Sequence, residues 1–367
     1  RHHGQQVFPQ LGREGSLRNK VGLVKEMQTM FQQTLGAQLP DIVTVHGTIS
    51  VDNSELDDFV IMRGDGIPTY NFAVVVDDST MDITHVIRGD DHIANTPKQV
   101  LVYKALGLEP PRFAHVPLLL GLDRSKLSKR FGATSVTEYA DLGYLPEALV
   151  NFLALLGWSY DDKRELFAKE EMIRYFDLDR VGKTGAVFNP EKLDWMNGYY
   201  IRQLSAEGLL EHGLHFLHKA NLVPQGPLPP QLREYLLAMM PLVQERLKRL
   251  AELPELIDFF LTDNLEYDAA LLIPKGLDKG TTLTALTRAR DLLVRMPDFD
   301  AAIMDAEMRT LAEELQLKTG QLFGALRVAV TGRTVAPPLF QTIAVLGRQR
   351  TMDRIDKAIQ QLGTLPS

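Results

Sequence analysis

The sequence contains no cysteine among its 367 residues. This absence excludes disulfide bonds, thiol nucleophiles and cysteine-ligated zinc sites. The sequence also lacks any run of the roughly 20 apolar residues that span a membrane, and its first ten residues have no apolar signal-peptide core. No two histidines are four residues apart, as on one face of a metal-binding helix. We therefore expect no structural metal and no membrane partner, and a location in the cytoplasm or, after processing, an organelle matrix.

Positive charge is also in deficit. Lys and Arg number 40 against 47 Asp and Glu, which gives a net charge of −7. This balance argues against a protein that coats nucleic acid non-specifically, although an acidic protein can carry a local basic surface that meets phosphates. A chain of this length exceeds one ordinary core, so two to four domains are expected.

The order of elements after residue 40 predicts a parallel α/β sheet. Short β-rich runs lie at 41–51, 57–63, 70–78 and 82–89. A helix is expected over 95–108, with Thr96 as its cap and Pro97 at its first position. Gly107 ends that helix, and another strand follows at 113–121. Strand, helix and strand in this order indicate a parallel sheet whose strand ends lead into loops.

The later sequence is helical. The run 146–159 is apolar on nearly every side, which predicts a buried helix, and Asn189-Pro190 begins another. The proline-rich segment 222–232 has the composition of a linker. Beyond it, apolar residues recur three and four apart, as at Leu322, Leu326 and Val330, and predict two small helical bundles. The expected fold class is therefore α/β followed by all-α.

A basic loop follows the last expected strand of the sheet. In KLSKR, Lys126, Lys129 and Arg130 surround Ser128, and glycines on either side of the loop let its backbone approach a ligand. Two ammonium groups and a guanidinium form a cationic clamp suited to a triphosphate, because nucleotidyl transfer needs charge stabilisation on the leaving pyrophosphate. The alternative is a solvated basic loop, since such short charged patterns recur often.

Two further positions could bind a small substrate. Tyr70 offers a hydroxyl at the start of an expected strand, for an amine or a carboxylate, although a packed core tyrosine is as common. Arg88 follows a strand and precedes a glycine, which suits a bidentate carboxylate contact at the end of the sheet. Asp90, Asp91 and His92 could bind ribose hydroxyls or an amine, or simply form a turn.

The order of these motifs resembles one family. The succession DDFVIMRGDGIPTYNFAVVVDD, ITHVIRGDDHIANTPKQ, FAHVPLLLGLDRSKLSKRFGATSV, GYLPEALVNFLALLGWS and FNPEKLDWMNGYYI is similar to that of bacterial-type glutamyl-tRNA synthetases, which are class I aminoacyl-tRNA synthetases. The resemblance runs from about residue 41 to the end. It implies the C-terminal part of a Rossmann-like catalytic domain, then a helical stem-contact region, then helical anticodon-binding bundles.

The resemblance also implies an activity and its partners. ATP, with Mg²⁺ as part of the substrate complex, would activate glutamate to glutamyl-adenylate, and the acyl group would pass to the 3′ end of tRNA(Glu). Charging of tRNA(Gln) as well stays open, and a monomer is expected. A glutaminyl enzyme would share the catalytic half, but its C-terminal part would be β-barrels rather than helices.

Site residues follow from the same resemblance. KLSKR is similar to the class I KMSKS signature, so its ATP phosphate contacts would be Lys126, Ser128, Lys129 and Arg130, with Lys129 catalytic. Asp91, Leu118 and Leu119 would contact the adenosine. Tyr70, Val74 and Arg88 would bind glutamate. Arg246 looks like an arginine that reads the third anticodon base, although a solvated helix face is an equal reading. Asp90 replaces the family's usual glutamate, which shortens the reach there.

The front of the chain departs from the family. Class I enzymes carry a His-x-Gly-His signature near the start of the nucleotide-binding fold, and no such stretch with its strand-loop-helix setting occurs here. Much of the first half of that fold is expected to be absent, and residue 1 is Arg. A catalytically incomplete tRNA-binding fragment or relative is therefore the alternative function. The expected segments are 1–40 (unassigned), 41–125 (partial catalytic), 126–206 (loop and stem contact), 207–262 and 263–367 (anticodon subdomains).

Overall fold

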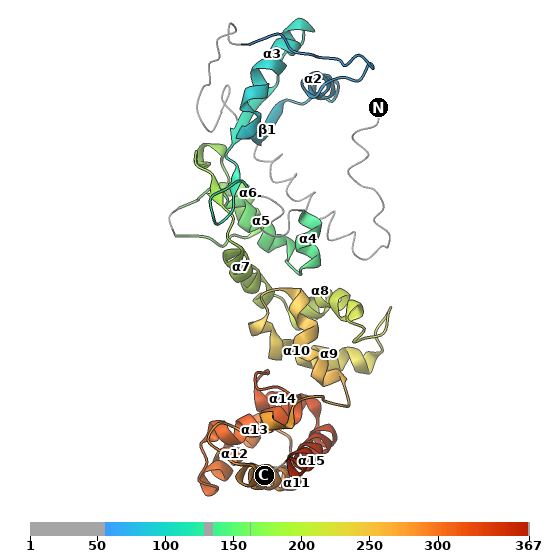
Figure 1. Ribbon diagram of the computed structural model, residues 1–367, viewed down its shortest axis with the longest axis vertical. Helices are drawn as coiled ribbons and strands as arrows, with labels where there is room; N and C mark the ends of the chain where they lie inside the picture. Colours follow the sequence, from blue (N-terminus) through green and yellow to red (C-terminus); the bar gives the residue numbers. More distant parts are fainter. Residues whose placement is uncertain (1–55, 128–134, 162, 366–367) are drawn as a thin grey trace. The chain divides into compact units, whose positions relative to one another are not determined.

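The computed structural model describes residues 56–127, 135–161 and 163–365 (Figure 1). It divides into two compact units, residues 1–197 and 198–367. Each unit is described here by itself. Within the described ranges, no helix is long and apolar enough to cross a membrane.

A parallel strand pair organises the first unit. β1 (His85–Gly89) pairs with β2 (Arg112–Val116), and Ile87 lies opposite Ala114. η2 (Asp90–Asn95) and α3 (Thr96–Ala105) connect the two strands, and α2 (Tyr70–Thr80) packs on α3 (Figure 1). The core between them contains Val75, Val102, Tyr103 and Phe113. The prediction of a parallel α/β sheet is confirmed.

The expected strand over residues 70–78 is wrong, because these residues form helix α2. Thr69 has extended φ and ψ of −77° and 164° directly before the helix, so the chain turns into the helix there. The run of valines favours a strand by propensity, but Val75 is fully buried against the α3 side of the core. Tertiary packing thus overrides a weak local preference. The run 57–63 likewise gives only an isolated bridge between Met62 and Pro68.

Helix α3 begins at Thr96, so its N-cap is Asn95 rather than the predicted Thr96. The shift has a consequence, because the Thr96 hydroxyl lies within the helix and is available to other side chains. Pro97 is therefore the second residue of the helix and not the first, as was predicted, but it still lies in the first turn, where proline is tolerated. Gly107 adopts a φ of +68° just beyond the helix, a left-handed conformation that glycine accepts without strain.

The rest of the first unit is mainly helical. The elements are β3 (Leu119–Leu120) and β4 (Ala186–Val187), a parallel pair, with α4 (Val136–Asp141), α5 (Pro146–Ala154), α6 (Lys169–Tyr175), η4 (Leu178–Arg180) and α7 (Pro190–Arg202). Most of α5 is buried, as predicted for this apolar run. Its buried Asn151 accepts from Phe167 N at 2.9 Å and donates to Glu165 O at 3.0 Å.

The described part of the second unit is helical, as predicted. Its elements are α8 (Ala206–Lys219), α9 (Pro230–Val243), η5 (Gln244–Arg246), η6 (Leu250–Glu252), α10 (Leu253–Leu261), η7 (Ala269–Leu272), α11 (Lys279–Arg295), α12 (Ala301–Glu314), α13 (Thr319–Thr331), α14 (Leu339–Leu346) and α15 (Arg348–Thr364). Leu322, Leu326 and Val330 are buried in α13, which confirms the helical spacing. The segment 222–232 lies between α8 and α9, and the boundaries at 207 and 263 stay predictions.

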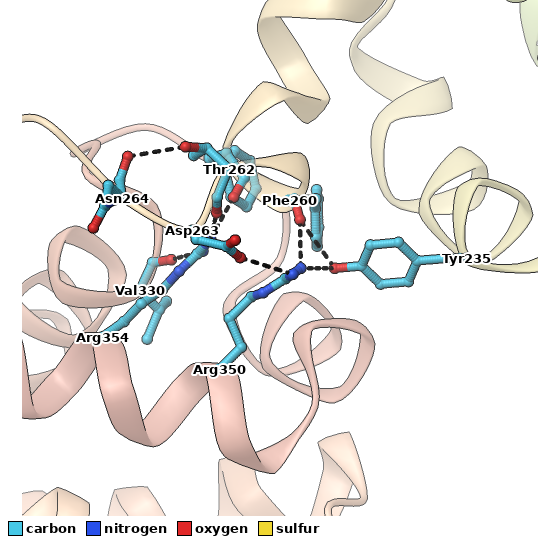
Figure 2. A network of polar contacts seen from close by, with 9 residues as sticks. Tyr235, Phe260, Thr262, Asp263, Asn264, Val330, Arg350 and Arg354 are labelled. Carbon is cyan, nitrogen blue, oxygen red and sulfur yellow. Dashed lines mark hydrogen bonds and ion pairs between the residues drawn. The ribbon is translucent and has the colours of Figure 1, made fainter. Parts of the chain in front are cut away.

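Two arginines of α15 fasten it to the end of α10 (Figure 2). Arg354 Nη2 donates to Phe259 O and Thr262 O, both at 2.6 Å, and its Nη1 donates to Val330 O at 2.6 Å. Arg350 Nη1 donates to Phe260 O at 2.8 Å. The last carbonyls of a helix have no partner within the helix and carry its negative dipole end, so cations there satisfy both needs.

Candidate functional site

The candidate site lies where β1 and β2 end. Both strands run parallel and finish at Gly89 and Val116, and ligands of open α/β sheets bind beyond such carboxyl ends. Tyr70 comes from the first turn of α2, and the chain that leaves β2 leads to Lys126. Elements far apart in the sequence therefore supply side chains to one edge of the sheet.

Arg88, the next-to-last residue of β1, is held on one side. Its Nη2 donates to Thr96 Oγ1 and Gln99 Oε1, both at 2.7 Å. Its Nε donates to His115 Nε2 at 3.4 Å, and its guanidinium lies 5.5 Å from the centre of the Phe113 ring. Nη1 has no hydrogen bond to any residue in the described ranges, so this nitrogen can meet a ligand. Arg88 was predicted to bind a carboxylate through two nitrogens. In the structure, its Nε and Nη2 already have partners, so Nη1 is the nitrogen that a carboxylate could reach.

Gln99 connects Arg88 to the start of α2. It is 1% exposed, and its Nε2 donates to Asn71 Oδ1 at 3.0 Å while its Oε1 accepts from Arg88. An arginine can only donate, so the amide oxygen must face Arg88 and the amide nitrogen must face Asn71. The direction of this chain of bonds follows from chemistry alone.

An acid and a tyrosine lie near Arg88. Burial raises the pKa of Asp78 on α2 above its usual range, and the nearby Arg88 charge opposes that rise. Burial likewise raises the pKa of Tyr103 to about 12, and the negative charge of Asp78 adds to the effect. The positive charge of Arg88 therefore favours the ionised form of Asp78.

Asp91 and Lys126 form an ion pair at the same edge. Lys126 Nζ lies 2.9 Å from Asp91 Oδ2, with side chains 63% and 39% exposed respectively. The hydrogen bond from Lys126 is the main cause that lowers the pKa of Asp91. A Cβ on Gly89 would lie only 2.6 Å from Asp91 Oδ1, so glycine permits this close approach. An exposed ammonium held by one carboxylate is free to turn to a phosphate.

Tyr70 lies beside His92 rather than at a strand entrance. Its hydroxyl is 3.4 Å from His92 Nδ1, and the side chain is exposed. Val74, one turn further along α2, packs against the core of the unit. The structure thus brings Tyr70 to the site edge and places Val74 against the core.

The two leucines expected at the adenosine have different surroundings. Leu118 Cδ2 lies 3.5 Å from where a Cβ of Gly89 would be, close to the Asp91 turn. Leu119, in β3, lines an apolar pocket of about 760 Å³ together with His85 and Ile87. His85 and Ile87 alternate along β1 with Val86 and Arg88, so this pocket belongs to the other face of the strand.

The predicted residues Ser128, Lys129 and Arg130 lie outside the described residues. Of the basic loop, the structure describes Lys126, whose backbone pairs with Leu120 in an isolated antiparallel bridge. Of the parts of the chain that are described, none brings together three or more His, Asp or Glu side chains that could hold a metal ion.

In the second unit, two arginines, Arg246 and Arg327, lie close enough for their charges to interact. Arg246 ends η5 and is exposed. Arg327 of α13 is half-buried, and burial, with the charge of Arg246 second, lowers its pKa. Arg249, which follows Arg246 closely in the sequence, pairs with Glu252 at 3.1 Å. The sequence analysis missed Arg327, although an arginine within the apolar run LFGALRVAV was a signal that could have found it.

The sequence analysis also missed the residues that hold Arg88. Gln99, Thr96 and His115 all lie within stretches assigned to secondary structure, and nothing in their spacing marked them as polar partners. His115 is 2% exposed within β2, and its Nε2 lies 2.9 Å from Thr96 Oγ1. A histidine within the expected strand 113–121, and a glutamine beside the apolar residues of the helix over 95–108, were the available signals.

Family models match nearly the whole described chain. Residues 30–195 match tRNA synthetases class I (E and Q), catalytic domain, and residues 209–359 match an anticodon binding domain. The catalytic match begins at residue 30, earlier than residue 41, where the resemblance was predicted to start. The prediction that residues before 41 bear no resemblance is therefore wrong.

Relatives agree with these matches. A glutamate–tRNA ligase of Dehalococcoides mccartyi (strain BAV1) is 52% identical over 97% of this chain and 72% of that protein. One from Roseiflexus castenholzii is 49% identical over 88% of this chain and 64% of that protein. A crystal structure of a glutamate tRNA ligase from Elizabethkingia meningosepticum, in complex with its amino acid, gives a TM-score of 0.72 at 32% identity, over 88% of this chain and 66% of that one. The chain thus spans only part of the length of these relatives.

Proposed function

The chain belongs to the glutamate–tRNA ligases, which are class I aminoacyl-tRNA synthetases, and we propose that it uses ATP to activate glutamate and transfers the glutamyl group to tRNA(Glu). The observation that carries this proposal is that Arg88, near the end of β1, and Lys126, paired with Asp91 just beyond that end, are both placed at one edge of the β1–β2 pair. One group suits a carboxylate and the other suits a phosphate. The names of the relatives favour this enzyme over a tRNA-binding fragment without catalysis.

Glutamate would bind through Arg88 and Tyr70. Arg88 Nη1 would donate to a substrate carboxylate, and the exposed Tyr70 hydroxyl would contact the amine or a carboxylate oxygen. Val74 would support this pocket from the α2 side. The substrate would then lie beyond the end of β1, where its reacting carboxylate can meet the α-phosphate of ATP.

ATP would bind through the basic loop. Lys126, Ser128, Lys129 and Arg130 would hold the phosphates, with Mg²⁺ arriving with the nucleotide rather than in a protein cage. A glutamate carboxylate oxygen would attack the α-phosphorus while the bond to pyrophosphate breaks, and Lys129 would stabilise the developing charge. Asp91, Leu118 and Leu119 would contact the adenosine. The terminal ribose hydroxyl of tRNA would then attack the acyl carbon and release AMP.

The helical part would read the tRNA. Residues 126–206 would contact the stem, and the subdomains 207–262 and 263–367 would bind the anticodon. Arg246 would read the third anticodon base, with Arg327 close enough for its charge to act on the same nucleotide. A monomer in the cytoplasm, with tRNA(Gln) as a further substrate to be tested, completes the proposal.

A charging assay tests the function. Labelled glutamate or glutamine, ATP and Mg²⁺ are incubated with the 367-residue chain and either tRNA(Glu) or tRNA(Gln). We expect glutamyl-tRNA(Glu) and no glutaminyl product. Binding of tRNA(Glu) without any charging would instead support the catalytically incomplete fragment.

The anticodon assignment has its own test. Arg246→Gln should change the ratio of charging rates on tRNA(Glu) and tRNA(Gln), because the altered side chain reads a different base edge. Arg288→Gln is the matched control, since Arg288 is also exposed and pairs with Glu314 at 3.1 Å. An unchanged ratio in Arg246→Gln would remove this assignment.

A further inference from the structure

Behind the candidate site lies the buried amide of Gln99. It lies on the α3 face that packs toward α2 and β1, and its two ends contact two different elements. One end receives the bond from Arg88 at 2.7 Å, and the other donates to Asn71 at 3.0 Å. Asn71 directly follows Tyr70 in the first turn of α2.

We infer that Gln99 is a positioning residue that sets the geometry of both glutamate-binding side chains at once, Arg88 on β1 and Tyr70 on α2. The inference rests on the proposed function and deepens it. Gln99, together with Thr96, holds Nη2 of Arg88 and leaves Nη1 without a hydrogen bond among the described residues. Through Asn71 it fixes the first turn of α2, from which the Tyr70 hydroxyl extends.

Because Gln99 is buried, the loss of either of its hydrogen-bond partners is costly. At 1% exposure, Gln99 has no water to replace a lost partner, so its acceptor needs Arg88 and its donor needs Asn71. Each bond fixes the direction of the next, because an arginine has donors only. The rotamers of Arg88 and Asn71 are therefore linked, and a change at Gln99 reaches both binding side chains without touching the substrate.

The kinetic test uses glutamate-dependent ATP–pyrophosphate exchange by the full chain. Gln99→Leu keeps the volume roughly and removes both bonds. Loss of one hydrogen bond to a charged group predicts a rise of about tenfold or more in KM for glutamate. KM for ATP should stay within about twofold, because the basic loop and not Arg88 would bind the nucleotide. Unchanged KM for glutamate in an active chain would overturn the inference.

A matched control separates positioning from loss of stability. Asn151→Leu removes another fully buried amide of the same unit, one that bonds to Glu165 and Phe167. It should lower the unfolding midpoint at least as much as Gln99→Leu does while leaving KM for glutamate at the wild-type value. An equal rise of KM in both variants would mean that Gln99 acts through stability alone.

A second readout does not need activity. In ¹⁵N-edited NMR of arginine side chains, Arg88 should rotate slowly about its Cζ–Nη2 bond in the wild-type chain and measurably faster in Gln99→Leu, where Nη2 keeps only its bond to Thr96. Gln99→Glu keeps an acceptor for Nη2, so slow rotation should return. If the wild-type chain shows no exchange, the proposed function fails, and these spectra still decide the inference. Equally slow rotation in wild type and Gln99→Leu would contradict it.

Discussion

Arg88 in the first unit and Arg354 in the second show two opposite uses of the same side chain. Arg354 is 4% exposed, and its Nη1 and Nη2 donate to three backbone carbonyls. Arg88 is half-buried and bonds to side chains, with Nη1 unbonded among the described residues. Arg354, which bonds to backbone carbonyls, holds parts of the fold together. Arg88, which bonds to side chains and keeps one nitrogen without a hydrogen bond among the described residues, can bind a ligand.

The charged surroundings of the two arginines also differ. Burial lowers the pKa of Arg354 to about 10, and the neighbouring charge of Arg350 contributes. Its positive charge is therefore disfavoured but is balanced by carbonyl dipoles at the end of α10. At Arg88, the positive charge favours the ionised form of Asp78, whose pKa burial raises. Backbone carbonyls hold the first arginine, whereas side chains hold the second.

The largest effect is expected at Arg354. Arg354→Met leaves Val330, Phe259 and Thr262 without their shared donor in a buried place, which should cost at least about 3 kcal/mol in the free energy of unfolding. Urea unfolding of the chain measures it. Arg309→Met on α12 is the control, since Arg309 is 56% exposed and pairs with Asp305 within one helix. Its expected change is below about 0.5 kcal/mol. Similar changes in both variants would break the comparison.

Arg88→Met should act on activity instead. Loss of a charge that meets a substrate carboxylate should lower kcat/KM for glutamate about 100-fold, or about 2.7 kcal/mol. The unfolding free energy should fall by only about 1–2 kcal/mol, because Gln99 loses its donor. Arg354→Met, measured at a temperature where it stays folded, should keep kcat/KM near the wild-type value. A reversed pattern would refute the division of roles.

Tyr235→Phe should have a smaller effect on stability than Arg354→Met, in the same part of the second unit. The Tyr235 hydroxyl donates to Phe260 O at 3.2 Å and accepts from Arg350 Nη1 at 3.2 Å (Figure 2). Arg350 also donates directly to Phe260 O, so the variant keeps part of the network. We expect a loss of about 1 kcal/mol in unfolding free energy and no change in exchange activity. A loss as large as that of Arg354→Met would mean that the two arginines act as one unit.

The smallest effect is expected at the exposed pair of Asp91 and Lys126. The folded pKa of Asp91 lies below its unfolded value of about 3.9, so its contribution to stability is present above that pH and is lost as pH falls through the folded pKa. Asp91→Asn should therefore lower the urea midpoint slightly at pH 7, and the difference should disappear as the solution is acidified. A difference that grows toward low pH would contradict the pairing.

The sequence predicted the elements that depend on periodicity. The buried helix α5, the spacing of Leu322 and Leu326 in α13 and the parallel order of β1 and β2 all follow from apolar patterns. Helix α2 did not, because its run of valines has strand propensity and only packing against α3 made it helical. The secondary-structure preference of a short run predicts its conformation poorly when one face of the run packs against an element that is distant in the sequence.

Some residues of the candidate site could likewise be predicted from the sequence, and others could not. Arg88 and Lys126 were predicted from their places after a strand and in a basic loop, because these positions alone imply exposure at the end of a sheet. Gln99 was not predicted, because its role comes from bonds to two residues that only the fold brings near. Arg327 was missed for a similar reason, since Arg246 reaches its vicinity from another element.

The most direct measurement is glutamate-dependent ATP–pyrophosphate exchange by the purified 367-residue chain, with tRNA(Glu) added, compared between wild type, Arg88→Met and Arg354→Met. The account predicts exchange that requires glutamate, falls about 100-fold in kcat/KM in Arg88→Met and persists in folded Arg354→Met. No exchange by the wild-type chain, or equal loss in both variants, would contradict the assignment of the β1–β2 edge as the site of glutamate activation.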